Sequence, residues 1–280
     1  MARDKSFLSH FLAEMGFRTL PEITVSRYDL DHDAIEPSKL ENILEFAAHN
    51  GWRTVVKPNG GSQGRGVRVT DDRQQLLGAI SDTLTTDGVC ILQQYCKMPE
   101  YRLVVLKGKV IQAYRRKPMT ITGDGSSTCE TLLKRRAEAI SQSRNEDNSL
   151  RLFAAAVRIF EVAGRDIKSV PAAAEQIVVG ETANLSAGGE AIGVMELLHP
   201  HWKELAIELA KRCGLLLCGI DIFIDEVSSD SSDYRVIEIN SAPGLDDYLL
   251  QGEAQKKRVL ALYREVLETA AAAMSSAAAN

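Results

Sequence analysis

Two apolar segments late in the chain each carry oxygen-bearing side chains where they finish. The first ends in Gly219-Ile220-Asp221, and the second reads Ile237-Glu238-Ile239-Asn240. If these segments are neighbouring strands of one sheet, Asp221, Glu238 and Asn240 lie side by side at one edge of it. Hard divalent cations such as Mg²⁺ prefer oxygen ligands of this kind. The pair of segments therefore predicts a magnesium site built on two strands.

A glycine-rich segment follows a predicted strand much earlier in the chain. The strand at 54–57 ends in Lys57, and glycines follow at positions 60, 61, 64 and 66. Glycines let backbone N–H groups approach a polyphosphate, because no Cβ stands in the way. The segment matches neither a Walker A loop nor G-x-G-x-x-G, and taken alone it also fits a long hairpin turn. The place of Lys57 at the strand end favours phosphate binding.

The remaining polar candidates lie between these two features. Gln93 and Gln94 are polar exceptions in an apolar strand at 89–95, where the backbone can pair with an adenine edge. Arginines at 102, 115 and 116 fall on a predicted hairpin, and guanidinium groups match phosphate oxygens. Asn184 lies in a small-residue loop at 182–189, which by itself reads as a plain surface turn.

Composition limits the class of protein. The chain has 280 residues and a net charge of −5, which disfavours a broad basic face for nucleic acid. The five cysteines form no C-x-x-C pair and are expected to be reduced. We identify neither a signal peptide nor an apolar run of the ~20 residues that span a bilayer. These features predict a soluble, cytoplasmic protein that binds neither nucleic acid nor a membrane.

Hydrophobic periodicity predicts an α+β protein with two lobes. Helices are expected at 6–15, 37–50, 71–84, 129–140, 150–162, 201–212 and 255–272. Strands are expected at 23–25, 54–57, 66–69, 89–95, 101–106, 109–115, 176–179, 215–224 and 234–239. The polar stretch 141–149 is predicted to be a mobile connector, and residues 273–280 a disordered tail.

Several motifs in order resemble one known superfamily. In chain order they are Lys-Pro-x-x-Gly-Ser-x-Gly-x-Gly at 57–66, Gln-Tyr-x-x-x-x-Glu-Tyr-Arg at 94–102, Thr-Gly-Asp-Gly at 122–125, Asn-Leu-Ser-x-Gly-Gly at 184–189, and Gly-x-Asp followed by Glu-x-Asn-x-x-Pro-Gly at 219–244. Over about residues 4–250 they resemble the ATP-grasp superfamily, and within it the ATP-grasp domains of cyanophycin synthetase and bifunctional glutathione synthetase.

The resemblance implies a fold and an activity. An ATP-grasp fold has two lobes, each with an antiparallel-rich sheet and helices, and binds ATP between them. The implied activity is a carboxylate–amine ligase that forms an amide bond through an acyl phosphate, with ATP and Mg²⁺ (two ions in the usual case, Mn²⁺ as a substitute). The whole of 1–280 is then expected to be one catalytic unit, with a first lobe at about 18–95 and a second at about 96–272. In contrast to the family pattern, no domain is expected before the first lobe.

The resemblance also assigns roles to residues. Phosphate contacts fall to Lys5 and Lys57, and the lid over the triphosphate to 61–66, which includes Gly61, Ser62, Gln63, Gly64 and Gly66. Adenine contacts fall to Gln93, Gln94, Tyr95 and Cys96, and the ribose contact to Glu100. Arg102 and Arg116 would neutralise the transferring phosphoryl group, and Asp221, Glu238 and Asn240 would bind Mg²⁺. Independently of the resemblance, the side-chain amide of Asn184 is a candidate to support phosphates, metal or a substrate at the catalytic site.

Two departures from the family pattern keep alternatives open. Relatives tend to carry an arginine just before the Asn-Leu-Ser-x-Gly-Gly loop, whereas this chain reads Val179-Gly180-Glu181-Thr182. Family members usually have a further domain before the ATP-grasp lobes, so the substrate site is expected to be open, or completed by a homodimer or a partner subunit. The substrates are expected to be amino acids or peptides. The alternatives are an ATP-binding protein of the same fold with impaired catalysis, and an ATP-grasp kinase.

Overall fold

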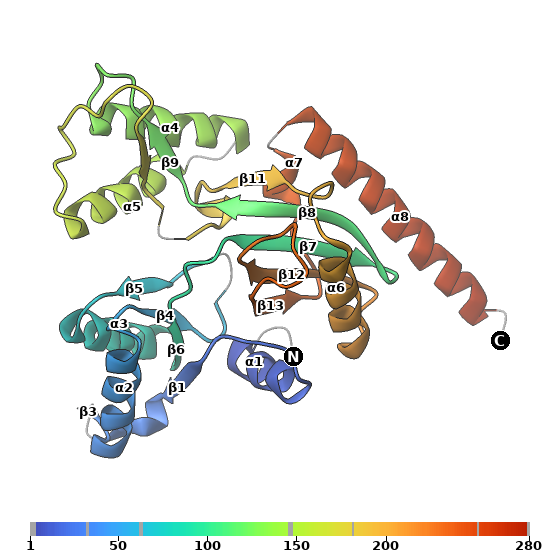
Figure 1. Cartoon of the computed structure of the whole chain (residues 1–280), viewed down its shortest axis with the longest axis horizontal. Coiled ribbons are helices and arrows are strands. Elements are labelled where there is room, and N and C mark those ends of the chain that lie inside the picture. Colours follow the sequence, from blue (N-terminus) through green and yellow to red (C-terminus); the bar gives the residue numbers. More distant parts are fainter. Residues whose placement is uncertain are drawn as a thin grey trace. The chain divides into compact units, whose positions relative to one another are not determined.

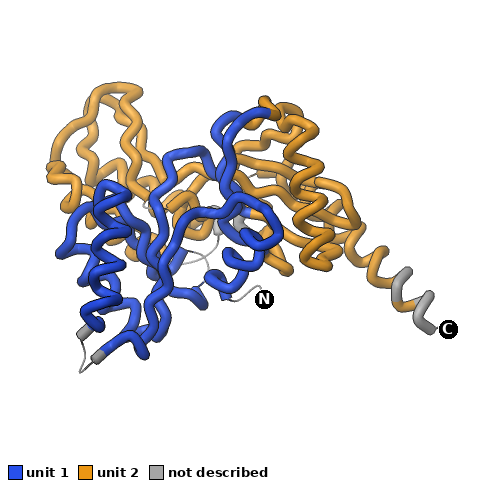
Figure 2. The backbone as a smooth tube through the Cα atoms, turned by 60° about the horizontal axis from the view of Figure 1, so that its bottom comes forward, with its two compact units in different colours: residues 1–100, 221–226, 231–239 blue, residues 101–220, 227–230, 240–280 orange. Residues whose placement is uncertain are grey.

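The computed structural model is built from helices and antiparallel sheets, which confirms the predicted α+β class (Figure 1). It describes residues 4–31, 34–61, 64–144, 148–180, 182–250 and 252–278. The chain forms two compact units (Figure 2). Unit 1 comprises residues 1–100, 221–226 and 231–239, and unit 2 comprises residues 101–220, 227–230 and 240–280. No helix in the described ranges combines the length and apolarity needed to span a bilayer.

Unit 1 is built around a four-stranded sheet. Its strands are β1 (Glu22–Ser26), β6 (Val89–Gln94), β4 (Thr54–Pro58) and β5 (Arg68–Thr70), in the order β1-β6-β4-β5. Helices α2 (Pro37–His49) and α3 (Arg73–Thr86) bury their apolar faces against this sheet. The side chain of Asp72 accepts the Gln75 N–H and so starts α3. Short elements η1 (Arg27–Asp29), β2 (Leu30–Asp31) and β3 (Ala34–Ile35), none of them predicted, lie between β1 and α2.

The two faces of this sheet differ in character. Val56 and Leu92 are fully buried in the core beneath the helices. Because side chains alternate along a strand, their neighbours Lys57 and Gln93 belong to the opposite face. The antiparallel register pairs Val55 with Gln93 and Lys57 with Ile91. The face away from the helices therefore carries two of the predicted nucleotide-binding side chains.

A five-stranded sheet runs through unit 2, and its last two strands contribute residues to both units. The order is β11 (Glu190–Gly193), β8 (Lys109–Lys117), β7 (Glu100–Leu106), β12 (Leu217–Ile224) and β13 (Tyr234–Asn240). The predicted hairpin is present, because Lys107 and Gly108 take φ values of 47° and 69° between β7 and β8. Helix α6 (Pro200–Arg212), short α7 (Asp246–Leu249) and α8 (Glu253–Ala278) complete this part of the chain.

A smaller group of elements within unit 2 has its own core. Helices α4 (Cys129–Arg144) and α5 (Ser149–Val162) pack with β9 (Thr120–Thr122) and β10 (Gln176–Val178) around buried Leu133 and Phe160, and Figure 1 shows them together in green to yellow. The predicted connector at 141–149 is wrong for its first residues, because α4 continues to Arg144.

The C-terminal helix is longer than its sequence pattern predicted. Helix α8 continues to Ala278, so it includes most of the segment expected to be a disordered tail. The segment is rich in alanine, which has the strongest intrinsic helix propensity, and this explains the extension. Residues 279–280 lie outside the described part of the chain.

Candidate functional site

A chain of hydrogen bonds crosses three strands of unit 1 and ends on Lys57. The Lys57 side chain is buried, and its Nζ donates to Gln93 Oε1 at 2.9 Å. Gln93 is buried as well, and its Nε2 donates to Glu22 Oε2 at 2.9 Å. Glu22 belongs to β1, Gln93 to β6 and Lys57 to β4. The amide of Gln93 therefore links a buried ammonium group to a carboxylate.

The pKa values of the two charged ends are shifted by burial. Burial lowers the pKa of Lys57, while the charges of Glu22 and Glu238 oppose that shift and Lys5 adds to it. Burial raises the pKa of Glu22, opposed by the charge of Lys57 and by hydrogen bonds from Gln93, Ser9 and Ser6. Each group would be poorly stabilised as an ion alone, so each stabilises the charged form of the other.

A second ammonium–carboxylate pair lies in the same unit. Lys5 Nζ is 3.0 Å from Glu238 Oε2, and both side chains are largely buried. Helix α1 (Lys5–Glu14) is positioned by its first turn, where the Asp4 carboxylate accepts the Phe7 N–H. The Asn59 side chain joins this turn, because its amide donates to Asp4 and its carbonyl accepts the Ser6 N–H. The structure thus brings together Lys5, Lys57 and Glu238, which the sequence assigned separately to phosphate and metal.

The residues predicted to bind Mg²⁺ fit a hard cation by their chemistry. Asp221 lies on β12 with 3% of its surface exposed, and Glu238 lies on the neighbouring strand β13. The ion pair with the Lys5 ammonium shows that the Glu238 carboxylate already interacts with a cation. Asn240 follows on β13, as part of unit 2. Among the described residues no cluster of three or more His, Cys, Asp or Glu side chains is found, and the predicted set has two carboxylates and one amide.

Two glycines of the predicted phosphate loop, Gly61 and Gly66, lie close to Pro58. A Cβ at Gly61 would lie 2.7 Å from Pro58 Cγ, which is closer than side chains approach one another. Gly66 has a φ of +75° and also packs against Pro58, so it meets both a conformational and a steric requirement. Ser62 and Gln63 lie outside the described residues. Packing against Pro58 explains glycine at positions 61 and 66, and the contact of the loop with phosphate stays a prediction.

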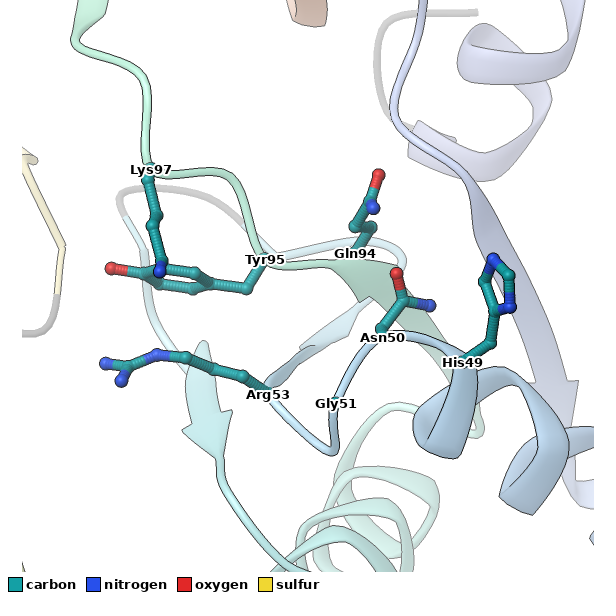
Figure 3. Close-up of a pocket in the computed structure, with 7 residues that line it drawn as sticks. All are labelled: His49, Asn50, Gly51, Arg53, Gln94, Tyr95 and Lys97. Carbon is teal, nitrogen blue, oxygen red and sulfur yellow. The ribbon is translucent and has the colours of Figure 1, made fainter.

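Two of the predicted adenine residues line a pocket of about 460 Å³ at the end of β6. Gln94 and Tyr95 share it with His49, Asn50, Gly51, Arg53 and Lys97 (Figure 3). The Arg53 guanidinium lies over the Tyr95 ring at 4.6 Å from its centroid. The neighbouring amide of Gln93 instead bonds to Lys57 and Glu22. Cys96 follows Tyr95, and burial raises the pKa of its thiol.

Sequence reasoning missed Glu22 and the basic side chains of this pocket. Glu22 opens a short strand, and its link to Lys57 depends on the pairing of β1 with β6. Arg53 immediately precedes β4 and is four residues before Lys57. Because side chains on a strand alternate between faces, this even spacing could have placed Arg53 on the same face as Lys57.

In unit 2, Arg102 is packed against a glycine of the metal motif. Arg102 lies on β7 and is 5% exposed. A Cβ at Gly219 would lie 2.8 Å from Arg102 Nη1 and 2.8 Å from Pro243 Cβ. The glycine of Gly-Ile-Asp therefore makes room for the guanidinium. Arg116 is also buried, on β8 opposite Ala191 of β11.

The loop that carries Asn184 is held by its backbone. The Asn184 carbonyl accepts N–H groups from Ala187 and Gly189 at 3.0 and 3.1 Å, around the short helix η2 (Leu185–Ala187). A Cβ at Gly189 would lie 2.8 Å from the Lys117 carbonyl oxygen. Arg151 of α5 places Nη2 3.5 Å from the Ser186 carbonyl, so an arginine does reach this loop from elsewhere in the chain. Glu181 lies outside the described residues.

Comparison with known sequences finds one family and related enzymes. Residues 145–259 match a family described as RimK-like ATP-grasp domain. Cyanophycin synthetase of Geminocystis herdmanii is 30% identical over 274 residues, which is 93% of this chain and 30% of the relative. The glutathione biosynthesis bifunctional protein GshAB of Clostridium perfringens is 26% identical over 223 residues, which is 77% of this chain and 28% of the relative. The chain thus spans about 30% of the length of these curated relatives.

Comparison with solved structures shows a shared fold. A bifunctional glutathione synthetase from Pasteurella multocida superposes with a TM-score of 0.50 at 18% identity, covering 93% of this chain and 36% of that protein. A D-alanine–D-alanine ligase from Bacillus anthracis superposes with a TM-score of 0.51 at 16% identity, covering 87% of this chain and 58% of that protein.

Proposed function

Because this chain belongs to the ATP-grasp superfamily, we propose that it is an ATP-dependent, ADP-forming ligase that joins a carboxylate to an amine. The ATP-grasp fold expected from the sequence motifs is confirmed. The activity is supported by the names of the relatives, which are a cyanophycin synthetase and a protein of glutathione biosynthesis. By analogy with them, the proposed substrates are amino acids or peptides.

One observation carries the proposal. Unit 1 holds a buried ammonium, Lys57, whose charge is compensated through Gln93, and a second ammonium, Lys5, paired with Glu238. Burying an ammonium group costs free energy, because the group loses its hydration. A buried lysine is therefore typical of a site that binds an anion. A triphosphate carries several negative charges, and Lys57 and Lys5 would bind its oxygens.

The proposed reaction has two steps. A carboxylate oxygen of the substrate attacks the γ-phosphorus, the bond from that phosphorus to ADP breaks, and an acyl phosphate forms. The amine nitrogen then attacks the acyl carbon, the C–O bond to phosphate breaks, and the amine loses a proton to solvent. The first step brings two anions together, and the second develops negative charge on the acyl oxygen and the leaving phosphate, so both require surrounding positive charge. Arg102 and Arg116 would supply it at the transferring phosphoryl group, with Asn184 as a hydrogen-bond donor.

Asp221, Glu238 and Asn240 are the residues that would hold Mg²⁺, which when bound neutralises part of the triphosphate charge. In this assignment two ions are proposed, with Glu238 among their ligands, and Mn²⁺ would substitute for Mg²⁺. Lys5 would then exchange its carboxylate partner for phosphate oxygens.

An ADP-release screen over pairs of amino acids, with Mg²⁺ present, tests the proposal. ADP release that requires both partners, together with a hydroxamate when hydroxylamine replaces the amine, is the expected result. ADP release with a stable phosphorylated product would instead identify a kinase. ATP binding with no turnover for any pair would leave a nucleotide-binding protein.

A further inference from the structure

We propose that Glu22 is a positioning residue of the nucleotide site, which acts through Gln93 to keep the Lys57 ammonium charged and directed at the bound phosphate. The inference rests on the proposed function only in taking ATP as the ligand of Lys57. Neither the motifs nor the comparisons assign a role to Glu22.

The Lys57 ammonium uses one of its N–H donors in the hydrogen bond to Gln93. An ammonium group has three N–H donors. Among the described residues, Gln93 is the hydrogen-bond partner of Lys57 Nζ, at 2.9 Å. The other amide end of Gln93 is occupied by Glu22, also at 2.9 Å, so the Gln93 side chain is oriented with its oxygen toward Lys57. Two donors of the ammonium therefore remain for an incoming anion.

The charges around Lys57 single out Glu22 as its compensating carboxylate. The charged groups that act on Lys57 are Glu22 from β1, Glu238 from β13 and Lys5 from α1. Glu238 forms an ion pair with Lys5 at 3.0 Å, so its charge is shared with another cation. Glu22 has the larger influence of the two carboxylates, and it supports Lys57 against desolvation.

The surroundings of Glu22 fix it in place. Its carboxylate accepts the Gln93 amide at 2.9 Å, and although burial raises its pKa, the side chains of Ser9 and Ser6 of α1 counter that rise. The Ser6 hydroxyl also meets the Thr24 hydroxyl at 2.6 Å, which ties α1 to β1. The bond to Gln93 places the Glu22 carboxylate at a defined position relative to Lys57, on a strand that α1 contacts through Ser6.

The variant Glu22→Gln tests the proposal, because it keeps the shape and removes the charge. We expect ATP affinity, measured by calorimetry without any amine or carboxylate substrate, to fall by about tenfold near pH 8.5. The defect relative to wild type should shrink toward about pH 6.5, because lower pH reprotonates a lysine that has lost its counter-charge. The dissociation constant of the variant is divided by that of wild type at each pH, so the effect of ATP protonation, which is common to both proteins, cancels.

A charge-relocation variant separates positioning from simple packing. Gln93→Glu in the Glu22→Gln background moves the carboxylate next to Lys57, and it should restore most of the lost affinity and its flat pH profile. Glu41→Gln, an exposed site on α2, is the matched control and should leave binding unchanged. If Glu22→Gln does not fold, Glu22→Asp is the second test, and it should weaken binding without the pH dependence.

The outcomes distinguish this inference from the proposed function. If wild type binds ATP and folded Glu22→Gln binds it equally well at both pH values, the role of Glu22 is refuted while the ligase proposal stands. A pH-independent loss that the double variant does not restore assigns Glu22 to packing alone, and it too overturns the inference. If wild type fails to bind ATP, the proposed function is refuted, and the role of Glu22 in binding ATP is refuted with it.

Discussion

The two units hold their candidate cationic side chains by different means. In unit 1, Lys57 is buried beside carboxylates, and the Gln93 amide transmits the charge of Glu22. In unit 2, Arg102 is buried close to Gly219, where the absence of a side chain leaves room for the guanidinium. For Lys57 the structure shows charge balance through a hydrogen-bonded amide, and for Arg102 it shows the space that a glycine leaves.

This difference determines which substitutions are informative. Replacing a carboxylate by an isosteric amide tests unit 1, because only the charge changes. Adding one carbon to a glycine tests unit 2, because only the volume changes. The two kinds of change should have separable effects on nucleotide affinity and on fold stability.

The largest effect is expected for Glu238→Ala in unit 1. The change removes the partner of Lys5 and a proposed Mg²⁺ ligand, so turnover should fall by at least about a thousandfold. ADP release under saturating ATP measures it. Glu265→Ala, at an exposed site on α8, should be neutral. Near-normal turnover in the Glu238 variant would remove the metal assignment.

The next largest effect is expected for Gly219→Ala in unit 2. The new Cβ would meet Arg102 and Pro243 at 2.8 Å, so Arg102 must shift. A shift of about 1 Å in a catalytic group can lower turnover by about a hundredfold. Overpacking of this kind costs roughly 1–3 kcal/mol of the free energy of unfolding.

Gly78→Ala is the control for the added carbon. Gly78 lies inside α3 with no atom within 4 Å of the new Cβ, so this variant should be more stable than wild type by about 0.5–1 kcal/mol. Denaturant unfolding measures both glycine variants. An equally stable and active Gly219 variant would show that shape does not hold Arg102.

A smaller effect is expected for Asp124→Asn, which contrasts an exposed carboxylate with buried Glu22. N–H groups of Ser127 and Ser126 lower the pKa of Asp124 below its ordinary value of 3.8, whereas burial raises the pKa of Glu22. A lowered pKa stabilises the fold above pH 3.8, and this contribution is lost as the pH falls through the folded-state value. The variant should therefore melt slightly below wild type at neutral pH, with the gap closing below pH 3.8. A gap that is constant from neutral to acidic pH would contradict this explanation.

Much of the secondary structure follows from local patterns. The period of the apolar residues predicted helices α1, α2, α3, α5 and α6, and the pair Lys107-Gly108 predicted the β7–β8 hairpin. The short strands β9 and β11 were missed, because three or four residues carry too little periodicity to stand out. The extent of α4 was underestimated, since its last turn is polar.

By itself, the sequence determined the order of the motifs, the strand before the glycine loop and the residues that can carry nucleotide and metal chemistry, because each is a local property of spacing and residue type. Only the tertiary structure decided that Glu22 compensates Lys57, that Lys5 meets Glu238 and that Gly219 accommodates Arg102. Lys57 and Gln93 are 36 residues apart, and Gln93 and Glu22 are 71 apart. Strand pairing brings such groups together, and a buried charge is stable only where that pairing delivers its partner.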